Sequence, residues 1–349
     1  MVNDLAYLYG EPEITGDLRT VESDFKVFEQ LPFSPCGEGE HLLIKVQKSG
    51  LNTVFVAKQL AKYFSVKENL VTYAGLKDRF AVTQQWFGVH VPGKQQYNLA
   101  DLVVDGLEIL EYARHNKKLR TGALTGNHFE ITLRNVSDIN TLVRRWHAIA
   151  EHGVPNYFGE QRFGIEGGNI ERAKALFSGT KVKDKKKRGI YLSAARSLLF
   201  NELVNQRVKE NIFDQLQAGD VLMLAGTQSV FPVEAVDEVL QKRFIEKDVD
   251  ITAPLWGAGA LMTAGEPQKL EQSLTAKFDD FCQGLAKFGL KQERRRIRLT
   301  LSEGKIETEQ DNNIVQLSFF LPSGCFATTI MRELLVYRDL TERIGGKKA

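Results

Sequence analysis

The chain has 349 residues, 43% of them hydrophobic and 26% charged, and its formal net charge is +2. This length predicts two domains with buried cores, and the near-neutral charge argues against a uniformly basic nucleic-acid binder. No run approaches the ~18 apolar residues of a membrane span, and residues 1–5 lack the basic and apolar regions of a signal peptide. We therefore expect a cytoplasmic protein without a membrane partner.

The chain begins with strong strand signals and one clear helix. Residues 41–46 are predicted to form a strand, and residues 53–64 a helix in which apolar residues recur every four positions. Asn52 or Thr53 is available as the N-cap of this helix.

Further elements follow up to a stop signal near the middle of the chain. Residues 71–74, 85–91 and 128–134 are predicted to form strands, the last with strictly alternating apolar and polar residues. Asp138 caps a predicted helix that ends near residues 153–155, where glycine and proline meet. This stop predicts a domain boundary.

The sequence changes character after this boundary. Residues 156–168 are rich in glycine and aromatic residues, and Ser193 is predicted to cap a long helix. Strand patterning then occurs at residues 221–224, 296–301 and 314–321, and a helix is predicted from about Ala327. Sheet-rich sequence at both ends around a helical and irregular block indicates a second domain inserted into the first.

Positive charge is concentrated in three places, residues 114–120, 181–188 and 291–298. Folding could bring these clusters onto one face that follows a phosphate backbone, despite the near-neutral total. The alternative for each cluster is a solvated charged loop.

The segment that most favours chemistry is residues 74–85, where Asp78 lies between Lys77 and Arg79. Gly75 indicates a turn, so Asp78 is expected on a loop positioned by two strands, a common location for reactive groups. The two flanking cations should keep the carboxylate ionised and attract an anionic substrate. The alternative is a solvated surface turn with local ion pairs.

Several other chemistries have no support in the sequence. It contains no phosphate-binding loop that ends in Lys-Ser or Lys-Thr, no dinucleotide fingerprint, and no paired-histidine or Cys-x-x-Cys metal motif. Cys36, Cys282 and Cys325 are odd in number and widely separated, which predicts reduced thiols. We infer neither a cofactor nor a metal.

Aromatic residues recur in turn-like and glycine-rich contexts beside amide or basic groups. They are Phe25, Phe129 beside Asn127, Tyr157 and Phe158 beside Arg162, and Phe326. Such rings suit unstacked bases, because stacking on an aromatic ring contributes ~1–3 kcal/mol per base, and an asparagine amide matches the imide edge of uracil. The alternative for each ring is core packing.

Four motifs closely resemble the tRNA pseudouridine synthase D (TruD) family. They are residues 74–85, 126–129, 154–164 and 321–328, and the similarity extends from Asp24 to Leu334. The resemblance implies an α+β fold, a pseudouridine synthase catalytic domain with a mostly antiparallel mixed sheet, interrupted by an inserted α/β TRUD domain. The catalytic domain would comprise residues 1–153 and 304–349, and the inserted domain residues 154–303.

By the same resemblance, Asp78 is the catalytic aspartate, and Phe25, Asn127, Phe129 and Phe326 line the uridine pocket. The implied activity is that of an isomerase that converts uridine-13 of glutamate tRNA to pseudouridine on a flipped-out nucleotide. Lys77, Arg79 and Arg162 are interpreted as supporting cations. The chain departs from the family pattern at Arg79, where a lysine is expected.

The residues leave the route of the reaction open. Asp78 could attack ribose C1′, add to uracil C6, or remove the C2′ proton. Other functions also stay open, namely a tRNA-binding chaperone, a methyltransferase that requires S-adenosylmethionine, and a metal-dependent nuclease. We infer tRNA as the partner and no obligate protein partner.

Overall fold

The computed structural model describes residues 4–93 and 95–341, and these divide into two units. The sheet unit comprises the described parts of Pro12–Glu151, Leu301–Ala327 and Leu334–Ala349. The helix unit comprises the described parts of Met1–Glu11, His152–Thr300 and Thr328–Glu333. Within the described residues, no helix is long and apolar enough to cross a membrane.

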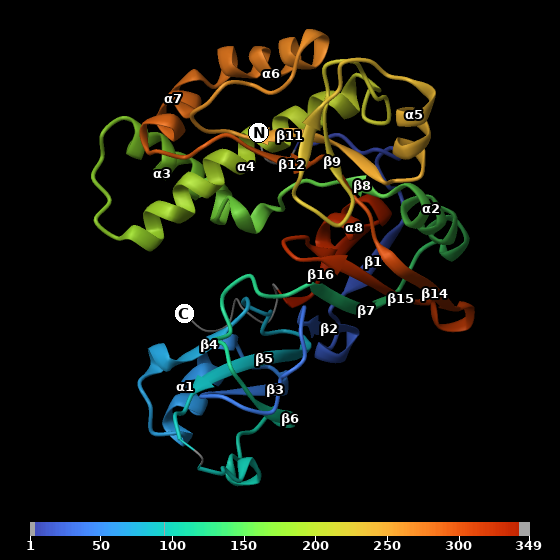
Figure 1. The fold of residues 1–349 in the computed structure, drawn as a ribbon. Coiled ribbons are helices and arrows are strands. Elements are labelled where there is room, and N and C mark those ends of the chain that lie inside the picture. The colour runs from blue at the N-terminus through green and yellow to red at the C-terminus, as the bar shows by residue number, and fades with distance from the viewer. Residues whose placement is uncertain (1–3, 94, 342–349) are drawn as a thin grey trace. The chain divides into compact units, whose positions relative to one another are not determined.

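The sheet unit is organised around one large mixed sheet, whose strands are labelled in the middle and lower parts of Figure 1. The principal strand order is β14-β15-β7-β2-β5-β3-β6, with β1, β16 and β4 joined beside it. Its strands are β1 (Thr15–Leu18), β2 (Phe25–Gln30), β3 (His41–Ser49), β4 (Val71–Tyr73), β5 (Val82–His90), β6 (Leu107–His115), β7 (Gly126–Arg134), β14 (Ser302–Glu309), β15 (Ile314–Pro322) and β16 (Val336–Asp339). The pairs β1–β16 and β2–β5 are parallel and the other pairs within this sheet are antiparallel.

Two helices of this part of the chain begin at the predicted caps. Helix α1 (Thr53–Tyr63) begins after Asn52, whose Oδ1 accepts from the Phe55 amide at 2.8 Å. Its apolar side packs on β3 and β5 in one hydrophobic core. Helix α2 (Ile139–His152) follows Asp138, whose Oδ1 accepts from the Thr141 amide at 2.9 Å. Both caps satisfy amides that have no partner within the helix.

The helix unit is built around a long central helix, α4 (Lys185–Lys209), coloured yellow-green in Figure 1. Its other helices are α3 (Gly168–Phe177), α5 (Glu238–Ile245), α6 (Gly265–Lys277) and α7 (Asp279–Lys287), while α8 (Ala327–Leu334) extends beyond this unit at both ends. Its strands are β9 (Val221–Leu224), β10 (Val230–Pro232), β11 (Val249–Leu255) and β12 (Glu293–Arg296) in one sheet, and β8 (Val154–Pro155) with β13 (Arg298–Leu299) in another.

Two sequence predictions are wrong in this unit. Ser193 does not cap the long helix, because α4 begins eight residues earlier after Asp184, whose side chain accepts from the Lys186 and Lys187 amides. The strand predicted over residues 296–301 is interrupted at Ile297, because β12 pairs with β11 whereas β13 pairs with β8. The predicted α+β fold with a large mixed sheet is confirmed.

Candidate active site

Asp78 lies on the loop between β4 and β5, and its side chain is 50% exposed. Oδ2 of this carboxylate lies 3.6 Å from Nη1 of Arg19, a residue almost sixty positions earlier in the chain. Arg19 is only 10% exposed, and its guanidinium group also binds the Asp339 carboxylate. The carboxylate is thus accessible from one side and faces a fixed cation on the other.

Hydrogen bonds hold the loop around Asp78 at several of its residues. The Gly75 carbonyl accepts from Gln85 Nε2 at 2.5 Å, and the Lys77 amide donates to Thr53 Oγ1 at 2.9 Å. The Asp78 carbonyl accepts from Lys48 Nζ at 2.8 Å. A backbone tethered in this way is preorganised, which is what a catalytic group requires.

The two cations that flank Asp78 in the sequence have other partners in the structure. Lys77 Nζ lies 2.5 Å from Oε2 of Glu29, and both side chains are buried. Arg79 Nε donates to the Gly50 carbonyl at 2.9 Å. The Asp78 carboxylate pairs with Arg19 instead. The sequence prediction assigned the cationic surroundings of the carboxylate to its two neighbours and did not identify Arg19, the residue that pairs with it.

Phe25 and Phe129 lie on one face of the sheet, together with Phe319 of β15. The Phe129 ring stacks on Phe319 with centroids 5.5 Å apart and meets Phe25 edge-on at 6.1 Å. The Arg19 guanidinium carbon lies 5.3 Å from the centre of the Phe25 ring, which links this aromatic group to Asp78. Phe25 and Phe129 are only 3% and 6% exposed, so a base could contact only a small part of each ring.

Asn127 lies two residues before Phe129 on the same face of β7, in register with Glu29 and Leu321. Its Oδ1 is buried and has no hydrogen-bond partner among the described residues. A buried acceptor without a partner costs ~1–3 kcal/mol, and a ligand that donates to this oxygen would remove that cost. Glu29, in register with Asn127 on the neighbouring strand, also binds Lys77, which belongs to the Asp78 loop.

Phe326 differs from the other predicted aromatic site residues in its exposure, and Arg162 differs from the other predicted site residues in belonging to the helix unit. Phe326 belongs to the sheet unit, follows a turn in which Gly324 has φ +80°, and is 38% exposed. Arg162 belongs to the helix unit, where its Nη1 donates to Ser193 Oγ at 3.1 Å and its guanidinium lies over the Phe158 ring. Burial lowers the pKa of Arg162.

Sequence reasoning missed three residues of this site, namely Arg19, Glu29 and Lys48. Lys48 carried a usable signal, because it continues the buried alternation of Leu42, Ile44 and Val46 along β3. Arg19 and Glu29 carried none, since their roles depend on contacts between segments far apart in the chain.

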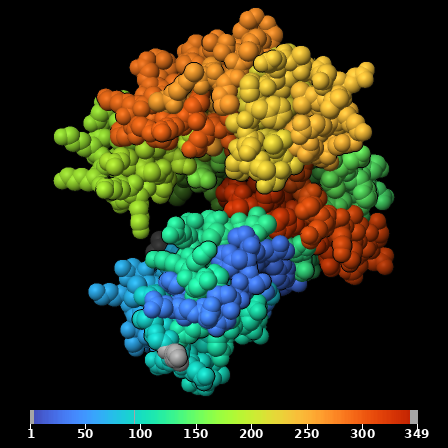
Figure 2. All heavy atoms as spheres, in the orientation of Figure 1, coloured from blue at the N-terminus to red at the C-terminus, as the bar shows by residue number. Residues whose placement is uncertain are grey.

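The three basic clusters differ in how many of their side chains bind other groups of the protein and how many are exposed. In the third cluster, Arg294 forms a buried ion pair with Glu271 at 2.8 Å, and Arg298 binds Asp214. In the first, the Arg114 guanidinium donates to three backbone carbonyls. Lys117, Lys118 and Arg120 of the first cluster are exposed, as are all the lysines of the second cluster, residues 181–188. Figure 2 shows side chains of this yellow-green region projecting from the surface.

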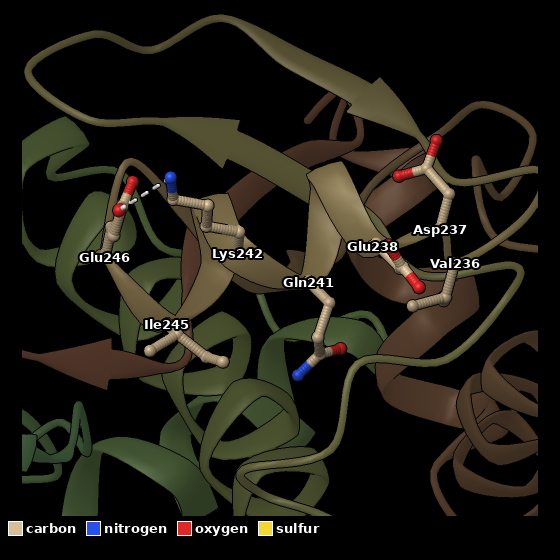
Figure 3. Close-up of a pocket in the computed structure, with 7 residues that line it drawn as sticks. All are labelled: Val236, Asp237, Glu238, Gln241, Lys242, Ile245 and Glu246. Atoms are coloured by element: carbon tan, nitrogen blue, oxygen red, sulfur yellow. Dashed lines mark ion pairs between the residues drawn. The ribbon is translucent and has the colours of Figure 1, made fainter.

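Other candidate features contribute no catalytic group. Within residues 4–93 and 95–341, no cluster of three or more metal-ligating side chains is found, and Cys36 and Cys282 are free thiols. A hollow of about 530 Å³ is lined by α5 and the residues just before it. Figure 3 shows that its charged side chains include the Lys242–Glu246 ion pair along one side of the helix. It contains none of the predicted site residues.

Comparison with known proteins supports the fold and gives the family. A family model described as tRNA pseudouridine synthase D (TruD) matches residues 1–179 and 169–334. The tRNA pseudouridine synthase D of Colwellia psychrerythraea is 64% identical over 356 aligned residues, covering 100% of this chain and 97% of the relative. That of Aeromonas hydrophila is 49% identical, covering 96% of this chain and 95% of the relative.

A solved structure shares the fold at much lower sequence identity. It is a Methanosarcina mazei protein described as a candidate tRNA pseudouridine synthase D, with a TM-score of 0.72 and 20% identity over 94% of this chain and 95% of that one. The large mixed sheet and the family match define an isomerase of the pseudouridine synthase class. The chain belongs to the tRNA pseudouridine synthase D family.

Proposed function

We propose that this chain isomerises uridine-13 of glutamate tRNA to pseudouridine and that Asp78 is its catalytic residue. The observation that carries this proposal is the half-exposed Asp78 carboxylate on a loop whose backbone is otherwise tethered, with Arg19 beside it. Family membership supports the reaction class and tRNA as substrate. The position within the tRNA is the finer part of the proposal.

The reaction rearranges one nucleotide. The bond between ribose C1′ and uracil N1 breaks, the base rotates, and a new bond joins C1′ to C5, while the proton lost from C5 is balanced by one gained at N1. One carboxylate can start this sequence by attack on C1′, by addition to C6, or by removal of the C2′ proton. Arg19 would offset the charge of Asp78 and fix its orientation in each route.

The uridine must leave the tRNA stack before Asp78 can reach its sugar, which costs a few kcal/mol. Asn127 could receive the extruded base, because an amide presents both an acceptor and donors to the uracil imide edge. Its buried Oδ1 without a partner is the acceptor this contact needs. Phe25 and Phe129 would form part of the pocket wall, and exposed Phe326 could contact a base with more of its ring.

The proposed architecture follows the family. We propose that residues 1–153 and 304–349 form the catalytic domain and residues 154–303 the inserted domain. The borders of the two units, at residues 151/152 and 300/301, lie close to these positions, while residues 4–11 and 328–333 group with the helix unit. The cytoplasmic location and the absence of an obligate protein partner stay predictions.

The decisive experiment compares Asp78→Asn with Asp105→Asn, an exposed carboxylate of the same unit. Unmodified tRNA is incubated with each purified protein, and pseudouridine is mapped by a chemical stop during reverse transcription. We expect the Asp78 variant to bind tRNA as the wild type does and to form no product, and the Asp105 variant to form product at the wild-type rate. Substantial turnover by Asp78→Asn would contradict the catalytic assignment.

The same assay separates the other candidate functions. Product at a uridine other than position 13 would contradict the proposed specificity alone. A protein that binds tRNA without forming product would be a chaperone, and one that modifies tRNA only when S-adenosylmethionine is added would be a methyltransferase. Cleaved tRNA would indicate a nuclease.

A further inference from the structure

We propose that Lys48 is a positioning residue for the isomerisation, whose buried amino group fixes the main chain of Asp78 against the sheet. This inference rests on the proposed role of Asp78. It assigns to Lys48 no contact with the substrate.

The contacts of Lys48 are directed at two loops. Its Nζ donates to the Leu51 carbonyl and to the Asp78 carbonyl, both at 2.8 Å. The first carbonyl lies between β3 and α1, and the second on the loop between β4 and β5. A single amino group therefore joins the segment that begins α1 to the residue that carries the proposed chemistry.

Lys48 is also placed in the row of the sheet that carries Phe129. Going from strand to strand, Lys48 is in register with Thr83, Thr83 with Val27, and Val27 with Phe129. Residues in register on neighbouring strands point to the same face. Lys48 therefore connects the backbone of Asp78 to the rigid row that would form the wall of the uridine pocket.

Lys48 is unusual because it is a fully buried lysine whose ammonium group binds main-chain carbonyls instead of a carboxylate. The side chain is 0% exposed, and its ammonium donates to two backbone carbonyls. Burial lowers its pKa to about 8, while the charges of Asp78 and Glu22 favour the protonated form and that of Lys77 opposes it. Methionine would fill a similar volume without this desolvation cost, so the amino group has a purpose other than filling space.

Other tethers of the loop act on the neighbours of Asp78. Gln85 holds Gly75, Thr53 holds the Lys77 amide, and Arg79 reaches Gly50 through its own side chain. The main chain of Asp78 itself is held by the hydrogen bond from Lys48 to its carbonyl. Removing it should let the carboxylate shift while the rest of the loop stays in place.

The test measures single-turnover kinetics of Lys48→Met on tRNA, with Lys45→Met as the matched control. Lys45 lies on the same strand but on its other face and pairs with Glu111 at 3.5 Å. We expect Lys48→Met to lower the single-turnover rate constant about 10- to 100-fold with unchanged tRNA affinity, since displacement by ~1 Å can cost this much. Lys45→Met should retain the wild-type rate constant.

The reaction amplitude separates positioning from folding. A purely structural role would lower the fraction of active molecules and hence the amplitude, but leave the rate constant of the folded molecules unchanged. A wild-type rate constant in Lys48→Met would overturn the inference. Should that variant not fold, Lys48→Gln takes its place, because its shorter amide cannot reach both carbonyls, and the same two outcomes decide.

Asp78→Asn in the same assay keeps this inference distinct from the proposed function. Loss of product in Asp78→Asn together with a wild-type rate in Lys48→Met would overturn the role of Lys48 alone. Full activity in Asp78→Asn would overturn both.

Discussion

Phe129 illustrates how burial changes the design of an experiment at the residue scale. With 6% of its surface exposed and contacts to Phe25 and Phe319, it is a core residue as well as a candidate pocket residue. Replacement by alanine would cost about 3–5 kcal/mol of stability through the cavity it leaves. Loss of activity in such a variant would not separate the two roles.

We therefore predict the behaviour of Phe129→Leu against Phe319→Leu. Both rings belong to the same stack, and Phe319 is fully buried. Both variants should lower the free energy of unfolding by about 1–2 kcal/mol, as measured by urea denaturation. Only Phe129→Leu should also lower the rate constant at saturating tRNA. Equal rate constants in the two variants would remove the Phe129 ring from the site.

At this scale the sequence indicated local motifs better than it indicated which residues form ion pairs with one another. Asp78 stood out as a catalytic candidate, a role that stays a prediction, because a carboxylate between two cations follows a turn signal. Its ion pair with Arg19 was not recognisable, because the two residues meet only when β1, β2 and β5 assemble. Long-range ion pairs have no local pattern in a single sequence.

At the element scale, the long strands β7 and β15, each with one buried face, were predicted, whereas the half-buried β2 and the exposed β14 were not. β7 and β15 alternate regularly, with Phe129, Leu133 and Phe319 among the buried positions. β14 is exposed along nearly its whole length, so its sequence shows no alternation. The long helix α4 was predicted to begin too late, because Ser193 resembles a cap although Asp184 provides one.

The junction of β7 with β15 gives a prediction at this scale. A Cβ added to Gly126 would lie 2.2 Å from the Leu321 carbonyl oxygen and 2.3 Å from the Phe320 ring. Gly126→Ala should therefore force the strands apart beside Asn127, lower the free energy of unfolding by about 1–3 kcal/mol, and reduce turnover.

Gly189→Ala is the matched control for that substitution. Nothing lies within 4 Å of a Cβ at this helical position, and alanine favours a helix by up to ~1 kcal/mol over glycine. Urea denaturation and turnover should show equal or greater stability and unchanged activity. A Gly126→Ala protein with wild-type stability would show that the strands accommodate the methyl group without strain.

At the scale of the whole molecule, the net charge gave little information about nucleic-acid binding. Burial and internal pairing decide which basic residues can contact a ligand. Arg294 and Arg298 are committed to internal ion pairs, and Arg114 to backbone carbonyls. Lys117, Lys118 and Arg120 are exposed, as are lysines 181, 183, 185, 186 and 187. The sequence alone could not separate these clusters, because charge density is similar in all three and only the fold determines which charges are paired internally.

This difference leads to a prediction for tRNA binding. Lys186 and Lys187 are exposed in the first turn of α4, and Asp184 caps that helix through their backbone amides, which glutamine preserves. The double variant Lys186→Gln with Lys187→Gln should fold normally and bind tRNA several-fold more weakly. Each lost phosphate contact should reduce the slope of log K against log salt by ~0.9 in a duplex region, hence by up to about 2. The rate constant at saturating tRNA should not change.

The control for this experiment removes the same charge elsewhere in the helix unit. Lys242 and Lys269 lie on its surface in local ion pairs with Glu246 and Glu266. Glutamine at these two positions should leave both the affinity and its salt slope unchanged in filter-binding titrations between low and high salt. If both double variants weaken binding equally, the tRNA responds to total charge rather than to a defined surface at the start of α4. A loss confined to Lys186 and Lys187 would instead assign that surface to the phosphate backbone, since phosphate contacts act locally and independently of base sequence.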